Sequence, residues 1–153
     1  MAKLNVGDRA PDFSLLDQYR QTLSLSDFEG QKLLLYFYPK AETPGCIRQA
    51  ISIRDAAEEL NSAGVAFVGV SPDTPEEQRA FDEKHNLHFP LLSDPDHKVA
   101  EAYGAWGTKS VQGQMKEGII RSSFLIDEHG TILQATYNVK PEDTVPRAQE
   151  ALV

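Results

Sequence analysis

The sequence predicts an α/β fold in which a central mixed sheet carries helices on both faces. Three observations support this fold class. Short apolar runs typical of buried strands alternate along the chain with segments of helical periodicity. The last two strand candidates are close enough to form an antiparallel hairpin, whereas helices separate the middle strands, which we expect to run parallel. The 153 residues contain no repeat and no linker-like segment, so we expect one domain over residues 1–153.

The expected strands are short and rich in aliphatic and aromatic residues. The clearest is segment 33–38, the longest unbroken apolar run, which suits a strand buried on both faces of a sheet. This run is far shorter than the roughly 20 residues of a membrane-spanning helix, so we expect no membrane partner. Gly130 provides the flexible backbone for the turn between the last two strands. The expected strands are residues 13–15, 22–24, 33–38, 65–70, 90–92, 122–126 and 131–137.

Helices are expected between these strands. The first occupies segment 45–64, where apolar residues recur at spacings of three, four and three, and Gly64 is suited to end it. These apolar residues are Ala50, Ile53, Ala57 and Leu60. The remaining helices are expected from the capping box at Thr74 to about Asn86, from Asp94 to Gly104, and over residues 147–152.

The charge balance excludes some classes of partner. Lys and Arg number 15 and Asp and Glu number 23, which gives a formal net charge of −8 without a long run of either sign. A protein that binds the phosphate backbone needs a basic segment, so we expect no nucleic acid partner. The first eight residues become polar too early for the apolar part of a secretory signal. We therefore expect a cytoplasmic protein.

Cys46, the only cysteine of the chain, is the candidate for chemistry. Thr43 and Pro44 have the residue types of an N-cap and a first helical position, which places Cys46 in the first turn of a helix. Unpaired backbone N–H groups and the helix dipole favour a thiolate there, and a thiolate is a nucleophile. A lone cysteine can also be merely a small buried apolar residue. Gly45 and the end of a buried strand nearby favour the functional interpretation.

The rest of the sequence limits which reaction Cys46 can perform. Without a second cysteine, no internal dithiol can exchange disulfides. His85 and His88 lack a clustered third ligand, so we expect no metal. A cysteine hydrolase would need an imidazole beside the sulfur, and that alternative stays open. The candidate bases are His85, His88, His97 and His129.

The segment Tyr38-Pro39-Lys40-Ala41-Glu42-Thr43-Pro44-Gly45-Cys46 resembles the peroxidatic-cysteine loop of the peroxiredoxins. The resemblance is to the subgroup called Q or bacterioferritin-comigratory protein, and it extends over nearly the whole chain. The other similar segments are residues 7–13, 68–71 with Asp73, 91–94, 103–107 and 118–127.

This resemblance implies a thioredoxin-like fold with an N-terminal β-hairpin and an enzyme that reduces hydrogen peroxide and organic hydroperoxides. Cys46 would attack the peroxide and become a sulfenic acid, without any cofactor. Arg121 would be the cation that pairs with the thiolate and the peroxide. Thr43 would orient the substrate, unless its hydroxyl only caps the helix, and Pro39 would shield the sulfur. Hydrogen-bond donors that are fixed in place before the reaction, such as Arg121, stabilise the charge that moves along the S–O–O axis without having to reorganise.

The chain departs from the subgroup at Ile51, where many members carry a second cysteine that resolves the sulfenic acid. The resemblance therefore implies a one-cysteine enzyme, a monomer whose sulfenic acid is reduced by an external thiol such as thioredoxin, glutaredoxin or glutathione. Residues five apart on a helix point about 140° apart, so a bridge between them would unwind the helix. We expect the helix start to stay ordered here. The alternative function is a redox-responsive sensor or binding module switched by oxidation of Cys46.

Overall fold

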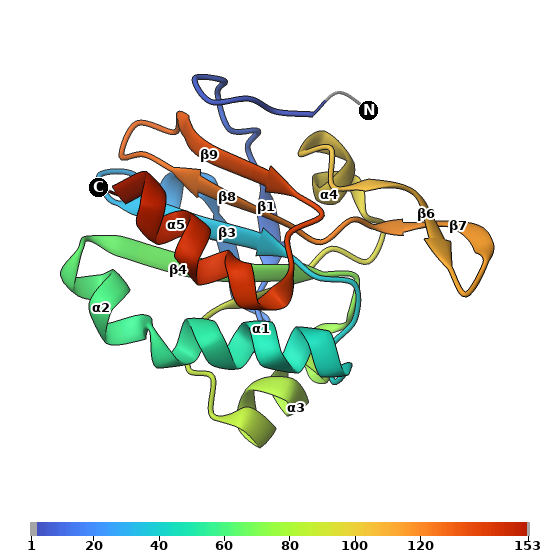
Figure 1. Cartoon of the computed structure of the whole chain (residues 1–153). Helices are drawn as coiled ribbons and strands as arrows, with labels where there is room; N and C mark the ends of the chain where they lie inside the picture. Colours follow the sequence, from blue (N-terminus) through green and yellow to red (C-terminus); the bar gives the residue numbers. More distant parts are fainter. Residues whose placement is uncertain (1–2, 153) are drawn as a thin grey trace.

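A seven-stranded sheet with the strand order β2-β1-β5-β4-β3-β8-β9 forms the centre of the computed structural model, which describes residues 3–152 (Figure 1). Residues 1, 2 and 153 of the expected domain lie outside the described residues. The strands are β1 (Ser14–Leu16), β2 (Thr22–Ser24), β3 (Lys32–Phe37), β4 (Val65–Ser71), β5 (Leu91–Ser93), β6 (Trp106–Val111), β7 (Gln114–Ile119), β8 (Ser122–Ile126) and β9 (Ile132–Tyr137). The helices are α1 (Pro44–Asp55), α2 (Ala57–Ser62), α3 (Pro75–His85), α4 (Lys98–Ala102) and α5 (Thr144–Leu152), with 3-10 turns at Leu25–Phe28 and Pro141–Asp143.

The pairing of the strands confirms the mixed sheet. β4 pairs in parallel with both β3 and β5, and the remaining pairs are antiparallel, including the β1–β2 hairpin and the β8–β9 hairpin. Gly130, in the turn between β8 and β9, has a φ of +88°, which suits glycine. β3 lies between β4 and β8, and its last five residues are buried. The expectation of a strand buried on both faces is therefore confirmed.

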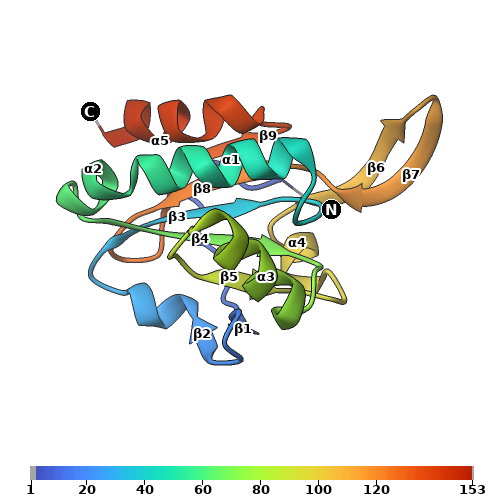
Figure 2. The ribbon, with the colours of Figure 1, turned by 90° about the horizontal axis from the view of Figure 1, so that it is seen from below.

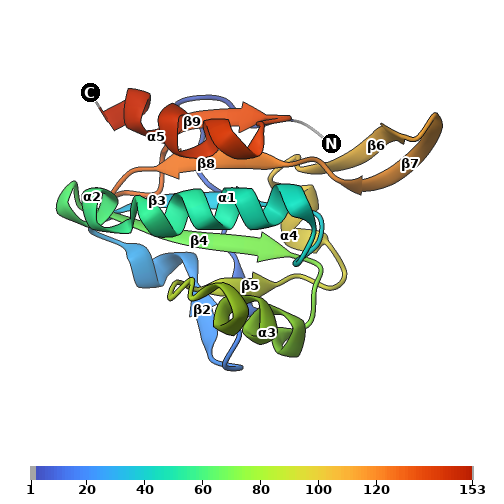
Figure 3. The same ribbon diagram turned by 60° about the horizontal axis from the view of Figure 1, so that its bottom comes forward.

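Alternation along β3 divides the core into two layers. Leu34 and Tyr36 belong to the apolar cluster that α1, α2, α3 and α5 cover. Leu33, Leu35 and Phe37 belong to the cluster on the opposite face, which α4 and the N-terminal segment cover. Figures 2 and 3 show α1 and α5 side by side along one face of the sheet. None of the helices described in residues 3–152 is long and apolar enough to cross a membrane.

Three expected helices differ from the structure. The expected helix 45–64 is broken into α1 and α2 at Ala56, whose ψ of about 1° is not helical. Ile53 and Leu60 are nevertheless both buried, as the periodicity predicts. Apolar periodicity indicates which face of a segment is covered, but it does not show whether the helix is continuous. α4 begins at Lys98, since buried Asp94 accepts hydrogen bonds from the N–H groups of its first turn. α5 begins three residues early at Thr144, because a proline is tolerated in a first helical turn.

The β6–β7 hairpin was absent from the sequence prediction. It projects from the end of the molecule at which α1 begins (Figure 2). Its residues from Gln112 to Glu117 are exposed, so no buried apolar run marks the strands. The turn residues Gln112 and Gly113 both have positive φ, as a two-residue hairpin turn of this twist requires.

Candidate active site

Cys46 lies in the first turn of α1, just beyond the carboxyl end of β3 (Figure 1). Thr43 has extended backbone angles and occupies the N-cap, and Pro44 is the first helical residue, as the sequence predicts. The Cys46 side chain is buried, with 1% of its surface exposed. A buried thiolate requires both hydrogen-bond donors and a cation, and the neighbouring residues provide them.

Arg121 provides the cation. It lies between β7 and β8, and its Nη2 donates a hydrogen bond to the Cys46 Sγ over 3.3 Å. Its Nη1 donates to the side-chain oxygen of Gln49 over 2.6 Å. The Arg121 carbonyl accepts from the Val139 N–H over 2.9 Å, which fixes the backbone as well. The structure thus brings together the two residues that the sequence analysis paired.

Gln49 is a site residue that the sequence analysis missed. It is fully buried one turn after Cys46, on the same side of α1. Its Nε2 donates to Thr144 Oγ1 over 2.7 Å, so its oxygen faces Arg121. The available signal was a polar amide among the apolar residues of the buried face of the helix.

The Thr43 hydroxyl does not cap α1. Its Oγ1 donates instead to the Lys40 carbonyl over 2.7 Å, within the loop between β3 and α1. The interpretation of this side chain as only a helix cap is therefore wrong. Pro39 is half-buried in the same loop, directly after buried Tyr38.

A buried polar network holds this loop against the sheet. Asp73 Oδ2 accepts hydrogen bonds from the Ala41 N–H over 2.7 Å and from the Ser71 hydroxyl over 2.6 Å. Gln78 of α3 donates to Ser71 Oγ and accepts from the Tyr38 hydroxyl. Burial raises the pKa of Tyr38, which keeps this phenol protonated as a donor. The motif that contains Asp73 gave no indication of this role.

Lys109 of the β6–β7 hairpin is a second cation near Arg121. Its Nζ donates to the Ile119 carbonyl over 2.8 Å. Burial, and then the positive charge of Arg121, lower the pKa of Lys109, whereas the negative charge of Cys46 opposes this shift. The hairpin was not predicted, so the sequence offered no reason to place Lys109 here.

The candidate imidazoles for a cysteine hydrolase lie in other contacts or on the surface, and His88 is exposed just after α3. His97 stacks on Trp106 with a centroid separation of 3.7 Å, and His85 Nε2 lies 3.4 Å from a Glu42 carboxylate oxygen. His129 lies in the turn between β8 and β9, at the end of the sheet remote from Cys46. Within residues 3–152, the side chain that hydrogen-bonds to the sulfur is a guanidinium and not an imidazole.

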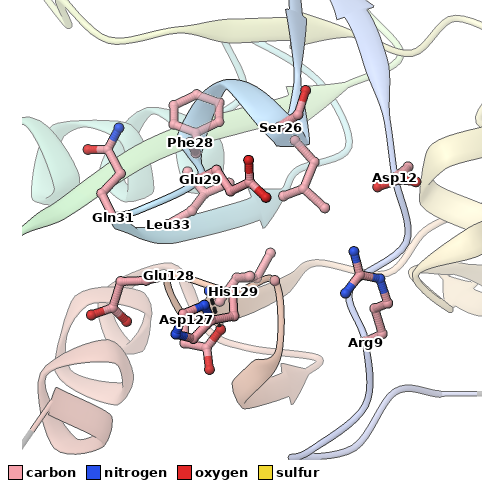
Figure 4. Close-up of a pocket in the computed structure, with 13 residues that line it drawn as sticks. Arg9, Asp12, Ser26, Phe28, Glu29, Gln31, Leu33, Asp127, Glu128 and His129 are labelled. Carbon is pink, nitrogen blue, oxygen red and sulfur yellow. Dashed lines mark hydrogen bonds between the residues drawn. The ribbon is translucent and has the colours of Figure 1, made fainter.

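A separate hollow lies at that remote end of the sheet (Figure 4). It has a volume of about 70 Å³ and an apolar floor that includes Leu33 and Ile126. Arg9, Asp12 and Glu29 are among its charged lining residues. β3 runs from Leu33 at this hollow to the loop before Cys46, so the hollow and the sulfur lie at opposite ends of the strand.

Comparison with known proteins identifies the family. Residues 6–135 match the AhpC/TSA family. The chain belongs to this family. It is 53% identical to peroxiredoxin Bcp of Escherichia coli over 132 residues, which cover 86% of this chain and 85% of that one. It is 42% identical to peroxiredoxin Bcp of Bacillus subtilis over 149 residues, which cover 97% and 95% of the two chains.

A solved structure agrees with these relatives. The structure of the bacterioferritin comigratory protein of Xanthomonas campestris, described with its alkyl peroxide reduction activity, is 31% identical and superposes with a TM-score of 0.85. The match covers 92% of this chain and 89% of that one. The fold is the thioredoxin-like fold of the peroxiredoxins, and the chain is a peroxiredoxin of the Bcp and Q kind, a thiol-dependent peroxidase.

Proposed function

We propose that Cys46 is the peroxidatic nucleophile and that a thiol from another molecule reduces its sulfenic acid. The contact of 3.3 Å between Arg121 Nη2 and Cys46 Sγ carries this proposal. The thiolate attacks one oxygen of a hydroperoxide, so that an S–O bond forms and the O–O bond breaks. Sulfur loses two electrons, and the leaving alkoxide or hydroxide takes a proton to become an alcohol or water. Hydrogen peroxide and organic hydroperoxides are the proposed substrates.

Arg121 stabilises the charge that moves along the S–O–O axis. Its guanidinium is held by Gln49 before the substrate arrives, so the donor need not reorganise during the reaction. Thr43 orients the substrate as an acceptor. Because its hydroxyl hydrogen is directed to the Lys40 carbonyl, its oxygen can receive the hydrogen bond of a peroxide O–H. Pro39 has no N–H, so it shields the sulfur without adding a competing donor.

The second half of the cycle requires an external thiol, because Cys46 is the only cysteine in the sequence. Ile51, where many relatives in the subgroup carry the resolving cysteine, is half-buried within α1. The proposed reductants are thioredoxin, glutaredoxin and glutathione. We further propose that the chain acts as a monomeric single domain in a reducing, cytoplasmic setting, because its only cysteine must return to the thiol. Nucleic acid and membrane have no part in this cycle.

Mass spectrometry of the intact protein after one equivalent of hydrogen peroxide tests this function. Without added thiol we expect the mass of one extra oxygen atom, and with glutathione we expect a mixed disulfide or the reduced protein. The variant Cys46→Ser should gain no oxygen. An unoxidised wild-type protein would exclude the peroxidase chemistry of Cys46. Oxidation that thioredoxin, glutaredoxin and glutathione all fail to reverse would instead make Cys46 a redox-responsive switch.

A further inference from the structure

Three segments that meet at the start of α1 carry a net positive charge although the chain as a whole is acidic. These segments are residues 39–48, 106–121 and 139–144. Arg121 contacts Cys46, and a Cβ added to Gly45 would lie 3.5 Å from Pro141. These segments contain six Lys or Arg and four Asp or Glu, a formal charge of +2. The rest of the chain contains nine Lys or Arg and nineteen Asp or Glu, a formal charge of −10.

In the described part of the chain, the cations of these segments form no close ion pairs, although the charge of Lys40 contributes, after hydrogen bonds from Thr74, to the lowered pKa of Glu77. Within residues 3–152, none of the five that accompany Arg121 forms an ion pair with a carboxylate. These five, which we call the cationic rim, are Lys40, Arg48, Lys109, Lys116 and Lys140. In the rest of the chain, seven of the nine Lys and Arg residues do form such pairs.

The acids in the same segments compensate the cationic rim only in part. Glu42 is already paired with Lys84 and His85. Glu117 follows Lys116 in β7, and Glu142 and Asp143 follow Lys140. Four of the five rim residues are exposed, so their charges are available to a solute that approaches the sulfur.

The β6–β7 hairpin brings two rim residues together. Lys109 and Lys116 are directly opposite in its register, so their side chains leave the same face of the hairpin. A Cβ added to Gly118 would lie 3.0 Å from Lys109 Cε, so the glycine leaves space for the lysine to lie across the strand. Like charges placed opposite each other destabilise a hairpin, and the hydrogen bond from Lys109 to the Ile119 carbonyl compensates this repulsion only in part. An anionic ligand would offset it.

The oxidised sulfur requires a thiol that can reach it. If α1 stays folded, a reductant must reach a sulfur that is only 1% exposed, which favours a small molecule. We infer that the cationic rim recruits a small thiol that carries carboxylates, with glutathione as the probe, to the oxidised Cys46. This inference rests on the proposed external reduction. The thiol sulfur forms an S–S bond with Cys46 as the S–O bond breaks, and the hydroxyl leaves as water with the thiol proton. A second thiol then releases Cys46 and forms the disulfide of the two small thiols.

The test follows the reduction half-reaction alone. Cys46 is first oxidised with one equivalent of hydrogen peroxide, which is uncharged, and then mixed with glutathione, neutral mercaptoethanol or cationic cysteamine. Rates are compared at equal thiolate concentration. At low salt we expect glutathione to react about tenfold faster than mercaptoethanol and cysteamine to react more slowly, because charge steers association. High salt should remove the difference.

Charge-reversal variants test whether the preference for glutathione depends on the cationic rim. Lys116→Glu combined with Lys140→Glu should lower the ratio of the glutathione rate to the mercaptoethanol rate severalfold. The matched control, Lys98→Glu with Arg147→Glu, makes the same change of charge outside the three segments and should leave that ratio unchanged. Rates that do not depend on thiol charge, or an equal loss in the control, would overturn the inference. Failure of the first oxidation would instead refute the proposed function.

A hydroperoxide that carries a carboxylate would be attracted by the same cations. To distinguish an anionic peroxide from an anionic thiol as the ligand of the rim, the rate of Cys46 oxidation is measured with hydrogen peroxide and with such a hydroperoxide. If the anionic peroxide reacted faster while the rate of reduction did not depend on the charge of the thiol, the inference that the cationic rim recruits the reductant would also be contradicted.

Discussion

Gln49 Nε2 donates a hydrogen bond to Thr144 Oγ1 over 2.7 Å, and both side chains are completely buried. This bond joins the middle of α1 to the beginning of α5. It also fixes which end of the Gln49 amide faces Arg121, because the nitrogen is held by the threonine. The position of the guanidinium at the sulfur therefore depends on a residue in the last helix of the chain.

Replacement of Thr144 by valine should loosen Arg121. The change removes the acceptor for Gln49 Nε2 and leaves a buried donor unpaired, which costs about 1–3 kcal/mol of unfolding free energy. With the amide free to turn, we also expect a severalfold lower rate constant for oxidation of Cys46 by hydrogen peroxide. Urea unfolding and rapid-mixing kinetics measure the two effects. Thr144→Ser keeps the hydroxyl and should restore the rate. A stability loss without a rate loss would show that Thr144 does not position Arg121.

Arg121→Gln tests the contribution of the positive charge beside Cys46 to the reaction rate, separately from any effect on folding. The change removes the positive charge beside Cys46 Sγ and the donor to Gln49 but keeps a polar side chain at this position. We expect the rate constant for peroxide reduction to fall about 10²–10³-fold, the range found when one preorganised donor is removed from an active site. Arg147→Gln, on the exposed side of α5, is the matched control. An unchanged rate in Arg121→Gln would remove the cation from the mechanism.

Thr43→Val tests whether the hydroxyl serves the substrate or the helix. Because Thr43 does not cap α1 with its side chain, the variant should lose less stability than the roughly 1 kcal/mol typical of a lost cap. The rate of Cys46 oxidation should nevertheless fall, since the acceptor for the peroxide is gone. Thr43→Ser should retain most of the rate. A variant that is strongly destabilised but fully active would point to a purely structural role.

The sequence was sufficient for the parts of the fold that depend on local pattern. The apolar run at β3 and the cap and proline before Cys46 are consecutive residues, so their placement follows from short-range rules. The pairing of Cys46 with Arg121 spans 75 residues and was inferred from the family resemblance alone. Gln49 and Thr144 were missed because a buried amide is recognised as functional only when its distant partner is known.

The β6–β7 hairpin shows a second limit of the sequence. Exposed strands are not marked by burial, and Gln112 with Gly113 is a weaker turn signal than Asn-Gly. The contribution of Lys109 and Lys116 to the charge around Cys46 therefore emerges only in three dimensions. In the linear sequence the charges look evenly scattered.

Tyr36 and Gly69 form a contact that predicts two opposite changes in stability. The buried Tyr36 hydroxyl has no hydrogen-bond partner within the described part of the chain, and a Cβ added to Gly69 would lie 2.8 Å from it. Tyr36→Phe removes an unpaired polar group and should leave stability unchanged or raise it by about 1 kcal/mol. Gly69→Ala should lower stability by about 1–3 kcal/mol through overpacking. Thermal unfolding of both variants checks this pair, and a strongly destabilised Tyr36→Phe would reveal a missing partner of the hydroxyl.

Ile51→Cys tests whether the absence of a resolving cysteine lets α1 stay folded during turnover. Five residues of helix rise about 7.5 Å, which already exceeds the roughly 7 Å between Cα atoms that a disulfide can span. A disulfide between positions 46 and 51 therefore requires the helix to unwind. In hydrogen exchange we expect the oxidised variant to lose amide protection over residues 45–53, whereas the wild-type sulfenic acid keeps it.

Ile51→Ala, which adds no thiol, should behave like the wild type in that experiment. If the wild-type protein lost protection over residues 45–53 on oxidation, the ordered helix start would be wrong, and larger protein thiols could then reach the sulfur. If it keeps protection, the sulfur stays recessed below the surface after oxidation. The reductant must then be small enough to reach a Cys46 sulfur that is only 1% exposed in the folded protein.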